Sequence, residues 1–290
     1  MTREGLKAAC EQAQQWLELC RRHALIDAGR VPRPQRSGRY ASTVATPWET
    51  WGLKEKLELL REINHQLKID DAIVDWQAHL SRWQTDVILV TSDGIHIEQA
   101  FHYISPGYAA VANRGTQTQE RTGGGWGSAL QGGLEQLAEF NFPDSARQVA
   151  EEAIALVNAP ECPDTRAALL LLPSQMMMQI HESIGHPLEL DRILGDERNY
   201  AGTSFVTPDM FGSYRYGSDL LNVTFDPGVA QEMGSYGFDD DGTPVEREYL
   251  IRDGVLLRPL GGVLSQARAG MPGVASARAC DSVSYTHLTL

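Results

Sequence analysis

The sequence predicts an α+β protein with two domains: an α/β N-terminal domain of helices and an antiparallel sheet (residues 1–160), and an incomplete β-rich domain (residues 161–290). Two patterns carry this prediction. In several stretches before residue 160, apolar residues recur at three- and four-residue steps, which is the period of an amphipathic helix. Between residues 72 and 108, and again after residue 204, short apolar or alternating runs lie between turn-forming residues, which indicates strands. The second domain is expected to carry one short helix with a histidine motif.

Two amphipathic helices are expected first in the chain. Thr2–Leu25 is the first, and its apolar face consists of Leu6, Cys10, Ala13, Leu17 and Cys20. Both of its cysteines are predicted to be small core residues. Trp48–Ile69 is the second helix, and its apolar face consists of Trp51, Leu53, Leu57, Leu60 and Ile63. Residues 31–49 are rich in Pro, Arg, Ser and Thr, so we expect an exposed connection there.

A hairpin and two further helices complete the first domain. Residues 87–98 hold two short strand-like runs on either side of Ser92-Asp93-Gly94, a sequence typical of a tight turn. Helices are predicted over Leu130–Phe140 and Asp144–Asn158. The short, polar, proline-bounded stretch Pro160–Asp164 predicts the domain junction.

The bulk properties exclude two classes of partner. The formal net charge is −13 at pH 7, whereas a nucleic-acid-binding surface is basic. No stretch approaches the roughly 20 apolar residues that cross a bilayer, and the N-terminus lacks the apolar region of a signal peptide. The four cysteines are scattered without paired spacing, which favours a reducing compartment. We therefore expect a soluble, cytoplasmic protein with neither a membrane nor a nucleic acid as partner.

One segment, His181–Asp191, concentrates groups that can do chemistry. It contains two imidazoles and three carboxylates in the run H-E-S-I-G-H-P-L-E-L-D. It follows Ala167–Leu172, a run that is apolar enough to predict a buried strand. Two neutral histidines can bind a divalent transition metal, most often zinc. Glu182, directly after the first histidine, can then take a proton from a water molecule whose pKa the metal lowers.

The spacing of the two histidines requires an irregular helix. In the H-E-x-x-H pattern the histidines are four residues apart and share one helix face, whereas His181 and His186 are five apart. At about 100° per residue, five steps separate the two side chains by about 140°. We expect a π-bulge or a helix end at Ile184–Gly185. Gly185 tolerates unusual dihedral angles, and Pro187 biases His186 away from helical geometry.

This segment resembles the signature of the TldD/PmbA family of metallopeptidases, H-E-x-x-G-H-x-L-E-G-D. It departs from that pattern at Leu190, where the family usually has glycine. Gly237–Gly242, followed by Tyr249–Leu256, is similar to the family's D-D-E-G segment and the hairpin after it. Two blocks in the family's order are much more specific than one. The carboxylates Asp239–Asp241 are expected at a solvated hairpin tip, with calcium binding or a place beside the substrate groove as alternatives.

The resemblance implies a zinc-dependent peptidase. His181 and His186 would hold the metal, and Glu182 would be the general base. Glu189 and Asp191 would be carboxylates that hydrogen-bond and orient the imidazoles. A catalytic zinc needs a third protein ligand, and in the family this is a cysteine in the C-terminal part of the second domain.

The third ligand is the open question of this sequence. We expect the chain to be truncated before the family's cysteine. Cys280 is the first substitute, although its sequence context differs from that of the family's ligand, and Glu189, Asp191 and His287 are weaker candidates. Residues from Ser282 onward do not resemble the family and are expected to be a foreign or frame-shifted tail.

The resemblance also implies substrates and partners. Substrates would be small or unfolded peptides admitted to an enclosed site. The working form would be a homodimer, or a heterodimer with a related subunit, in which this chain is the metal-bearing partner. Two alternatives stay open: a non-catalytic or inactive truncated subunit of such a complex, and a metal-dependent amidase that acts on non-peptide substrates.

Overall fold

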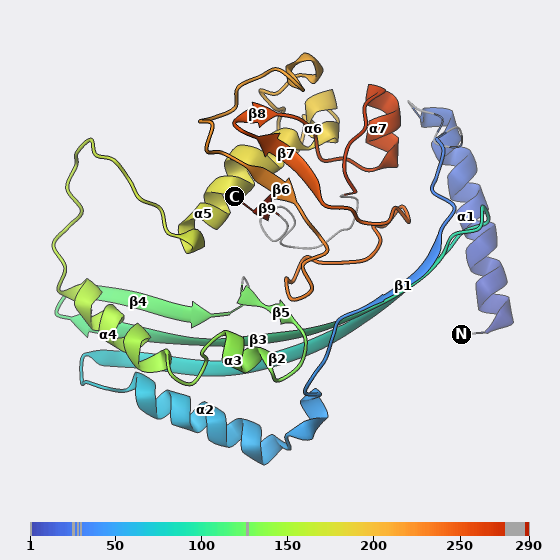
Figure 1. The fold of residues 1–290 in the computed structure, drawn as a ribbon. Coiled ribbons are helices and arrows are strands. Elements are labelled where there is room, and N and C mark those ends of the chain that lie inside the picture. Colours follow the sequence, from blue (N-terminus) through green and yellow to red (C-terminus); the bar gives the residue numbers. More distant parts are fainter. Residues whose placement is uncertain are drawn as a thin grey trace.

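The computed structural model describes residues 2–24, 27, 29, 31–125, 128–275 and 288–289. It confirms an α+β fold, with helices and two separate sheets. The larger sheet belongs to the first half of the chain, and the smaller one to the second half (Figure 1). None of the described helices is long and apolar enough to cross a lipid bilayer.

The larger sheet is built around one long central strand. Its strands are β1 (Ser37–Ala41), β2 (Ile73–Val90), β3 (His96–Arg114), β4 (Gln117–Gly124) and β5 (Leu130–Gln131). Strand β3 pairs antiparallel with β2, β4 and β5, and parallel with β1. The predicted β2–β3 hairpin is therefore confirmed. The expectation of an exposed connection over residues 31–49 is wrong in part, because β1 pairs with β3 there.

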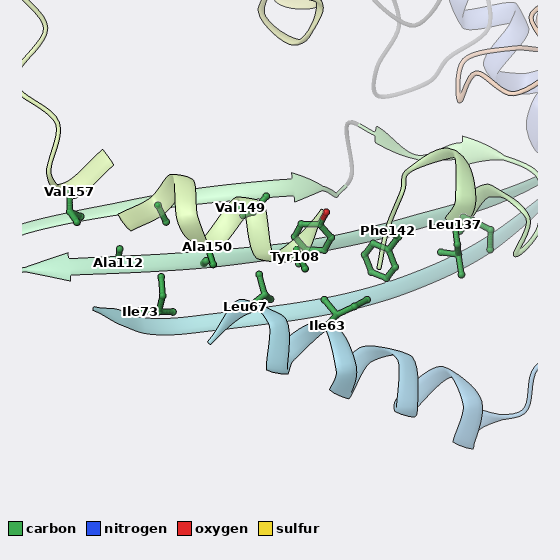
Figure 2. Close-up of a cluster of buried hydrophobic side chains, with 14 of the residues drawn as sticks. Ile63, Leu67, Ile73, Tyr108, Ala112, Leu137, Phe142, Val149, Ala150 and Val157 are labelled. Carbon is green, nitrogen blue, oxygen red and sulfur yellow. The ribbon is translucent and has the colours of Figure 1, made fainter. Parts of the chain in front are cut away.

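Helices cover one face of this sheet and form the first core. They are α2 (Leu53–Leu67), α3 (Gln136–Glu139) and α4 (Ala146–Val157), with a short 3-10 turn at Trp48–Thr50 before α2. Figure 2 shows Ile63 and Leu67 of α2 packed with Val149 and Ala150 of α4 against the sheet. Tyr108 of β3 stacks on Phe142 at a ring-centroid distance of 5.3 Å.

The first helix, α1 (Arg3–His23), contributes nothing to either core. None of its residues is buried, and Cys10 and Cys20 are both exposed. The prediction that these cysteines are core residues is therefore wrong. The apolar period is present, but none of the residues of α1 is buried by it. Figure 1 shows α1 beside the far end of the long β2–β3 hairpin.

The connection from α4 to the second half is exposed. Residues 158–172 have no regular secondary structure beyond the end of α4, and they extend away from the body of the molecule (Figure 1). Leu169 is 84% exposed and Leu170 91% exposed. The predicted buried strand at Ala167–Leu172 is therefore wrong for this structure. A strand needs a neighbour for its backbone hydrogen bonds, and no described strand lies alongside this stretch.

The second half packs on the other side of the same central strand. Its regular elements are α5 (Pro173–Ile180), a π-helical turn (His181–Gly185), 3-10 turns (His186–Leu188 and Pro208–Met210), α6 (Leu190–Leu194), β6 (Val223–Phe225), β7 (Glu248–Arg252), β8 (Val255–Leu256), α7 (Val263–Ala269) and β9 (Leu288–Thr289). Phe101 and Tyr103 of β3 join the buried apolar residues of this half in a second core. Strand β3 therefore supports both cores.

Candidate metal centre

One buried apolar face fixes the segment that carries the two histidines. Ile180, Ile184 and Leu188 recur at four-residue steps, and all three are buried in the second core. Pro173 occupies the first turn of α5, where its missing N–H costs nothing. The helix is therefore anchored on one side, and His181 and His186 lie off that buried face, half-buried.

The expected widening of the helix is confirmed. Residues His181–Gly185 form a π-helical turn, in which the His186 N–H donates to the His181 carbonyl five residues back. In such a turn, residues five apart stack along the helix, so the five-residue spacing that is wrong for an α-helix is right here. Gly185 has φ −54° and ψ −69°, which any L-residue can adopt. Its expected use of unusual dihedral angles is therefore not seen.

The turn brings the two imidazoles together. The ring centroids of His181 and His186 are 4.3 Å apart, with an interplanar angle of 69°. Glu182 lies beside them, and the ligand atoms that these three side chains offer all lie within 4.8 Å of one another. Two imidazole nitrogens and a carboxylate are a donor set that suits a transition metal such as zinc.

The surroundings favour the neutral form of His181. Burial lowers its pKa, and the neighbouring His186 and Arg192 lower it further, while the Glu182 carboxylate acts in the opposite direction. A neutral imidazole has a nitrogen lone pair that can bind a metal, and an imidazolium does not. The electrostatics of the site therefore agree with a ligand role.

A chain of ionic contacts holds the second histidine. His186 Nδ1 lies 2.9 Å from Glu189 Oε1, and Glu189 Oε2 accepts a hydrogen bond from Arg192 Nε at 3.1 Å. Arg192 also pairs with Glu197 at 3.0 Å. Burial raises the pKa of Glu189, and His186 and Arg192 counteract this effect. If Nδ1 donates to the Glu189 carboxylate, Nε2 keeps its lone pair and is free to bind an ion.

The other predicted site residues are placed less favourably. The carboxylate of Asp191, on α6, accepts a hydrogen bond from the backbone N–H of Arg192. Within the described part of the chain, neither imidazole is its hydrogen-bond partner. Cys280, His287 and the tail from Ser282 lie outside the described residues.

Two residues in the site were missed by the sequence analysis. The hydroxyl of Tyr216 donates to the Ser183 carbonyl inside the π-helical turn. Nothing in the sequence indicates this contact, because Tyr216 lies in a turn-rich stretch far along the chain. Arg192 had a weak signal, since it follows Glu189 by three residues on a short helical stretch.

The acidic segment lies close to the site but is not a solvated tip. Asp239 is 2% exposed, and its Oδ1 accepts hydrogen bonds from the backbone N–H groups of Asp241 (3.0 Å) and Thr243 (2.8 Å). The expectation of a solvated hairpin tip is therefore wrong for Asp239. Burial raises its pKa to about 6, and Asp241 adds to the effect.

A cavity of about 370 Å³ adjoins the histidine segment. Five carboxylates and Arg268 line it, together with small and apolar residues: Glu189, Asp191, Asp196, Glu197, Asp241, Leu260, Gly261, Gly262, Leu264, Ser265 and Arg268. Glu189 also contacts His186. Glu189 therefore both lines the cavity and contacts the second imidazole.

Two family models match the chain. The PmbA/TldA metallopeptidase central domain matches residues 46–157, and the PmbA/TldA metallopeptidase C-terminal domain matches residues 164–290. The two models together cover most of the chain, and the second contains both histidines.

Curated relatives are similar over most of this chain. A metalloprotease of Synechocystis sp. is 28% identical over 225 residues, which are 76% of this chain and 45% of the relative. A protein of Buchnera aphidicola (subsp. Acyrthosiphon pisum), described as a metalloprotease and TldD homologue, is 26% identical over 80% of this chain and 47% of its own length. The chain spans about half the length of these relatives.

Solved structures share the fold at low sequence identity. TldE of Thermococcus kodakarensis has a TM-score of 0.62 at 15% identity, over 98% of this chain and 61% of that one. A structure from Bacteroides thetaiotaomicron has a TM-score of 0.68 at 14% identity, over 88% of this chain and 55% of that one. At these identities the likeness shows the fold alone.

Proposed function

The chain belongs to the PmbA/TldA (TldD) metallopeptidase family, and from that premise we propose that it is the metal-bearing part of a zinc-dependent peptidase that hydrolyses small or unfolded peptides. The observation that carries this proposal is the π-helical turn that places His181 and His186 4.3 Å apart, with Glu182 beside them. An ordinary α-helix would separate these rings.

Each residue of the site has one task in this proposal. His181 and His186 would hold a zinc ion, and Glu189 would fix His186 with Nε2 toward it. A bound ion would polarise the scissile carbonyl and lower the pKa of the attacking water. Glu182 accepts a proton from that water as its oxygen bonds to the carbonyl carbon. When the C–N bond breaks, Glu182 delivers the proton to the leaving amine.

We propose that the third metal ligand is neither Glu189 nor Asp191. Glu189 is engaged by His186 and Arg192, and Asp191 by a backbone N–H. Of the predicted candidates, Cys280 is the best donor chemically, because thiolate binds zinc well. We propose to test it first, with a longer chain or a partner subunit as the other source of a ligand.

Metal content tests the proposal. We expect about one zinc per chain by mass spectrometry of the purified protein, and loss of that zinc in His181→Ala. Glu182→Gln should keep the metal and lose peptide hydrolysis. If Glu182→Gln still hydrolyses peptides, Glu182 is not the general base. A chain without zinc would instead favour the non-catalytic subunit, and a panel of peptides beside acylated small molecules separates a peptidase from an amidase.

We also propose a setting for this activity. The structural likeness to TldE, read with the TldD-type relative, supports assembly with a second copy or with a related subunit. Cys10, Cys20 and Cys162 are free thiols on exposed positions, which agrees with a reducing cytoplasm. The oligomeric state in solution, measured by light scattering with and without a co-expressed relative, tests the assembly.

A further inference from the structure

We propose that Tyr216 is a positioning residue for the two histidines: it supplies the hydrogen bond that Pro187 cannot make, and so holds the π-helical turn. The contact itself is the Tyr216 hydroxyl donating to the Ser183 carbonyl. The consequence for metal binding rests on the proposed metal site, whereas the consequence for the turn does not.

The need for an outside donor follows from the sequence of the motif. In an α-helix the carbonyl of residue 183 accepts from the N–H of residue 187. Residue 187 is proline and has no N–H. The Ser183 carbonyl therefore loses its usual partner at the point where the helix widens. A carbonyl left without a partner in a partly buried place is costly.

Tyr216 is well placed to donate a hydrogen bond to the Ser183 carbonyl. Its ring lies 5.8 Å from Phe205 and 6.1 Å from Tyr214, centroid to centroid, and it belongs to the edge of the second core. These contacts fix the direction of its hydroxyl. Burial also raises the pKa of Tyr216 to about 12, so the hydroxyl keeps the proton that it donates.

The turn has little other freedom. Ile184 and Leu188 are buried on one side, and Ser204 Oγ donates to the Pro187 carbonyl at 2.7 Å on the other. If the Ser183 carbonyl turns to find another donor, the backbone between His181 and His186 must rotate with it. The spacing of the two rings depends on that backbone, so Tyr216 acts on the site without touching it.

Amide hydrogen exchange of the metal-free chain tests the turn directly. Tyr216→Phe removes only the hydroxyl. We expect the His186 amide, which donates to the His181 carbonyl, to exchange about tenfold faster in this variant. The amides of Leu250 and Ile251 in β7 should be unchanged, which separates a local effect from a general loss of stability.

A matched control is available two residues earlier. Tyr214→Phe removes the same group from the ring that packs on Tyr216, and it should leave the exchange of the His186 amide unchanged. Zinc affinity is the second readout: we expect about tenfold weaker binding in Tyr216→Phe, measured by competition with a chelator.

Restoring an N–H donor at residue 187 should reduce the effect of Tyr216→Phe. Pro187→Ala supplies an N–H at residue 187, so Tyr216→Phe should have a smaller effect on exchange and on zinc affinity in that background than in the natural chain. If Tyr216→Phe alone fails to fold, recovery of the fold in the double variant supports the inference, and failure of both overturns it.

The outcomes separate this inference from the proposed function. Unchanged His186 exchange in Tyr216→Phe overturns the positioning role, whatever the metal does. Faster exchange together with no zinc in the natural chain leaves the role of Tyr216 standing and counts against the metal site. Equal effects of Tyr216→Phe in both backgrounds overturn the link to Pro187.

Discussion

At the scale of single residues, Asp239 is a carboxylic acid in a place that disfavours its charge. Burial raises its pKa to about 6 in the folded chain, whereas the unfolded value is near 3.9. The folded state therefore binds this proton more tightly than the unfolded state. Protonation of Asp239 therefore contributes to the free energy of unfolding. This contribution is fully present below about pH 4 and is lost as the pH rises through about 6.

Asp239→Asn removes this pH dependence. The amide oxygen can still accept from the Asp241 and Thr243 N–H groups, and it carries no charge. We expect the variant to exceed the natural chain in free energy of unfolding by about 3 kcal/mol at pH 8, and by less than about 1 kcal/mol near pH 4. Urea unfolding at both pH values measures this. The exposed Asp253→Asn is the control, and equal differences at pH 4 and pH 8 would contradict the prediction.

The same residue shows where sequence reasoning stops. Three successive carboxylates usually indicate a solvated turn, and the turn is indeed present at Asp239–Gly242. The segment just before this turn is held against β3 by Gln99, whose side chain binds the backbone of Gly237 and Phe238. That contact joins residues far apart in the chain, and no local pattern encodes it.

A second prediction at this scale concerns Glu189 and its effect on zinc affinity. Its carboxylate bridges His186 and Arg192, so Glu189→Gln weakens the hold on the imidazole while keeping the shape of the side chain. We expect zinc affinity to fall by about 10- to 100-fold. Glu197→Gln removes a carboxylate that contacts Arg192 but not His186 and is the control. Equal affinities for the two variants would show that Glu189 does not orient the ligand.

At the scale of elements, α1 and α2 have similar apolar periods and different surroundings. Leu17 of α1 is 50% exposed, and Leu67 of α2 is fully buried. We expect Leu17→Ala to change the free energy of unfolding by less than about 0.5 kcal/mol, and Leu67→Ala to lower it by about 2–5 kcal/mol. Thermal unfolding of the two variants measures the contrast. A large loss in Leu17→Ala would mean that α1 packs against something in solution.

The elements that were predicted correctly are encoded by residues close together in the sequence. The five-residue spacing of the histidines and the proline after them sufficed to predict an irregular turn at Ile184–Gly185, and the Ser92-Asp93-Gly94 turn sufficed for the hairpin. The elements that were predicted wrongly depend on partners. The run Ala167–Leu172 has strand-like residues but no described neighbour, and β1 has few strand signals but pairs with β3.

At the scale of the whole molecule, strand β3 joins the two halves of the chain. Tyr108 and its neighbours face the first core, and Phe101 and Tyr103 face the second. Two buried glutamines add polar links. Gln131 binds the backbone carbonyls of Ser235 and Glu232, and Gln99 binds three backbone groups of the acidic segment. The halves are therefore expected to unfold together.

Gln99→Met tests this coupling. The substitution keeps the length of the side chain and leaves the N–H groups of Gly237 and Phe238, and the Phe238 carbonyl, without their partner, at a cost of about 2–4 kcal/mol. Trp83 packs against the second core, so tryptophan fluorescence does not isolate the first half. Amide exchange of Ile63 and Leu67 in α2, followed against urea, reports the first half, and that of Leu250 and Ile251 in β7 reports the second. In the natural chain the two urea midpoints should coincide. In Gln99→Met the urea midpoint of the second-half probe should fall, because the lost hydrogen bonds belong to that half. The exposed Gln77→Met is the control and should leave both midpoints unchanged. Coinciding, unshifted midpoints in Gln99→Met would mean that the hydrogen bonds of Gln99 are not needed to couple the two halves.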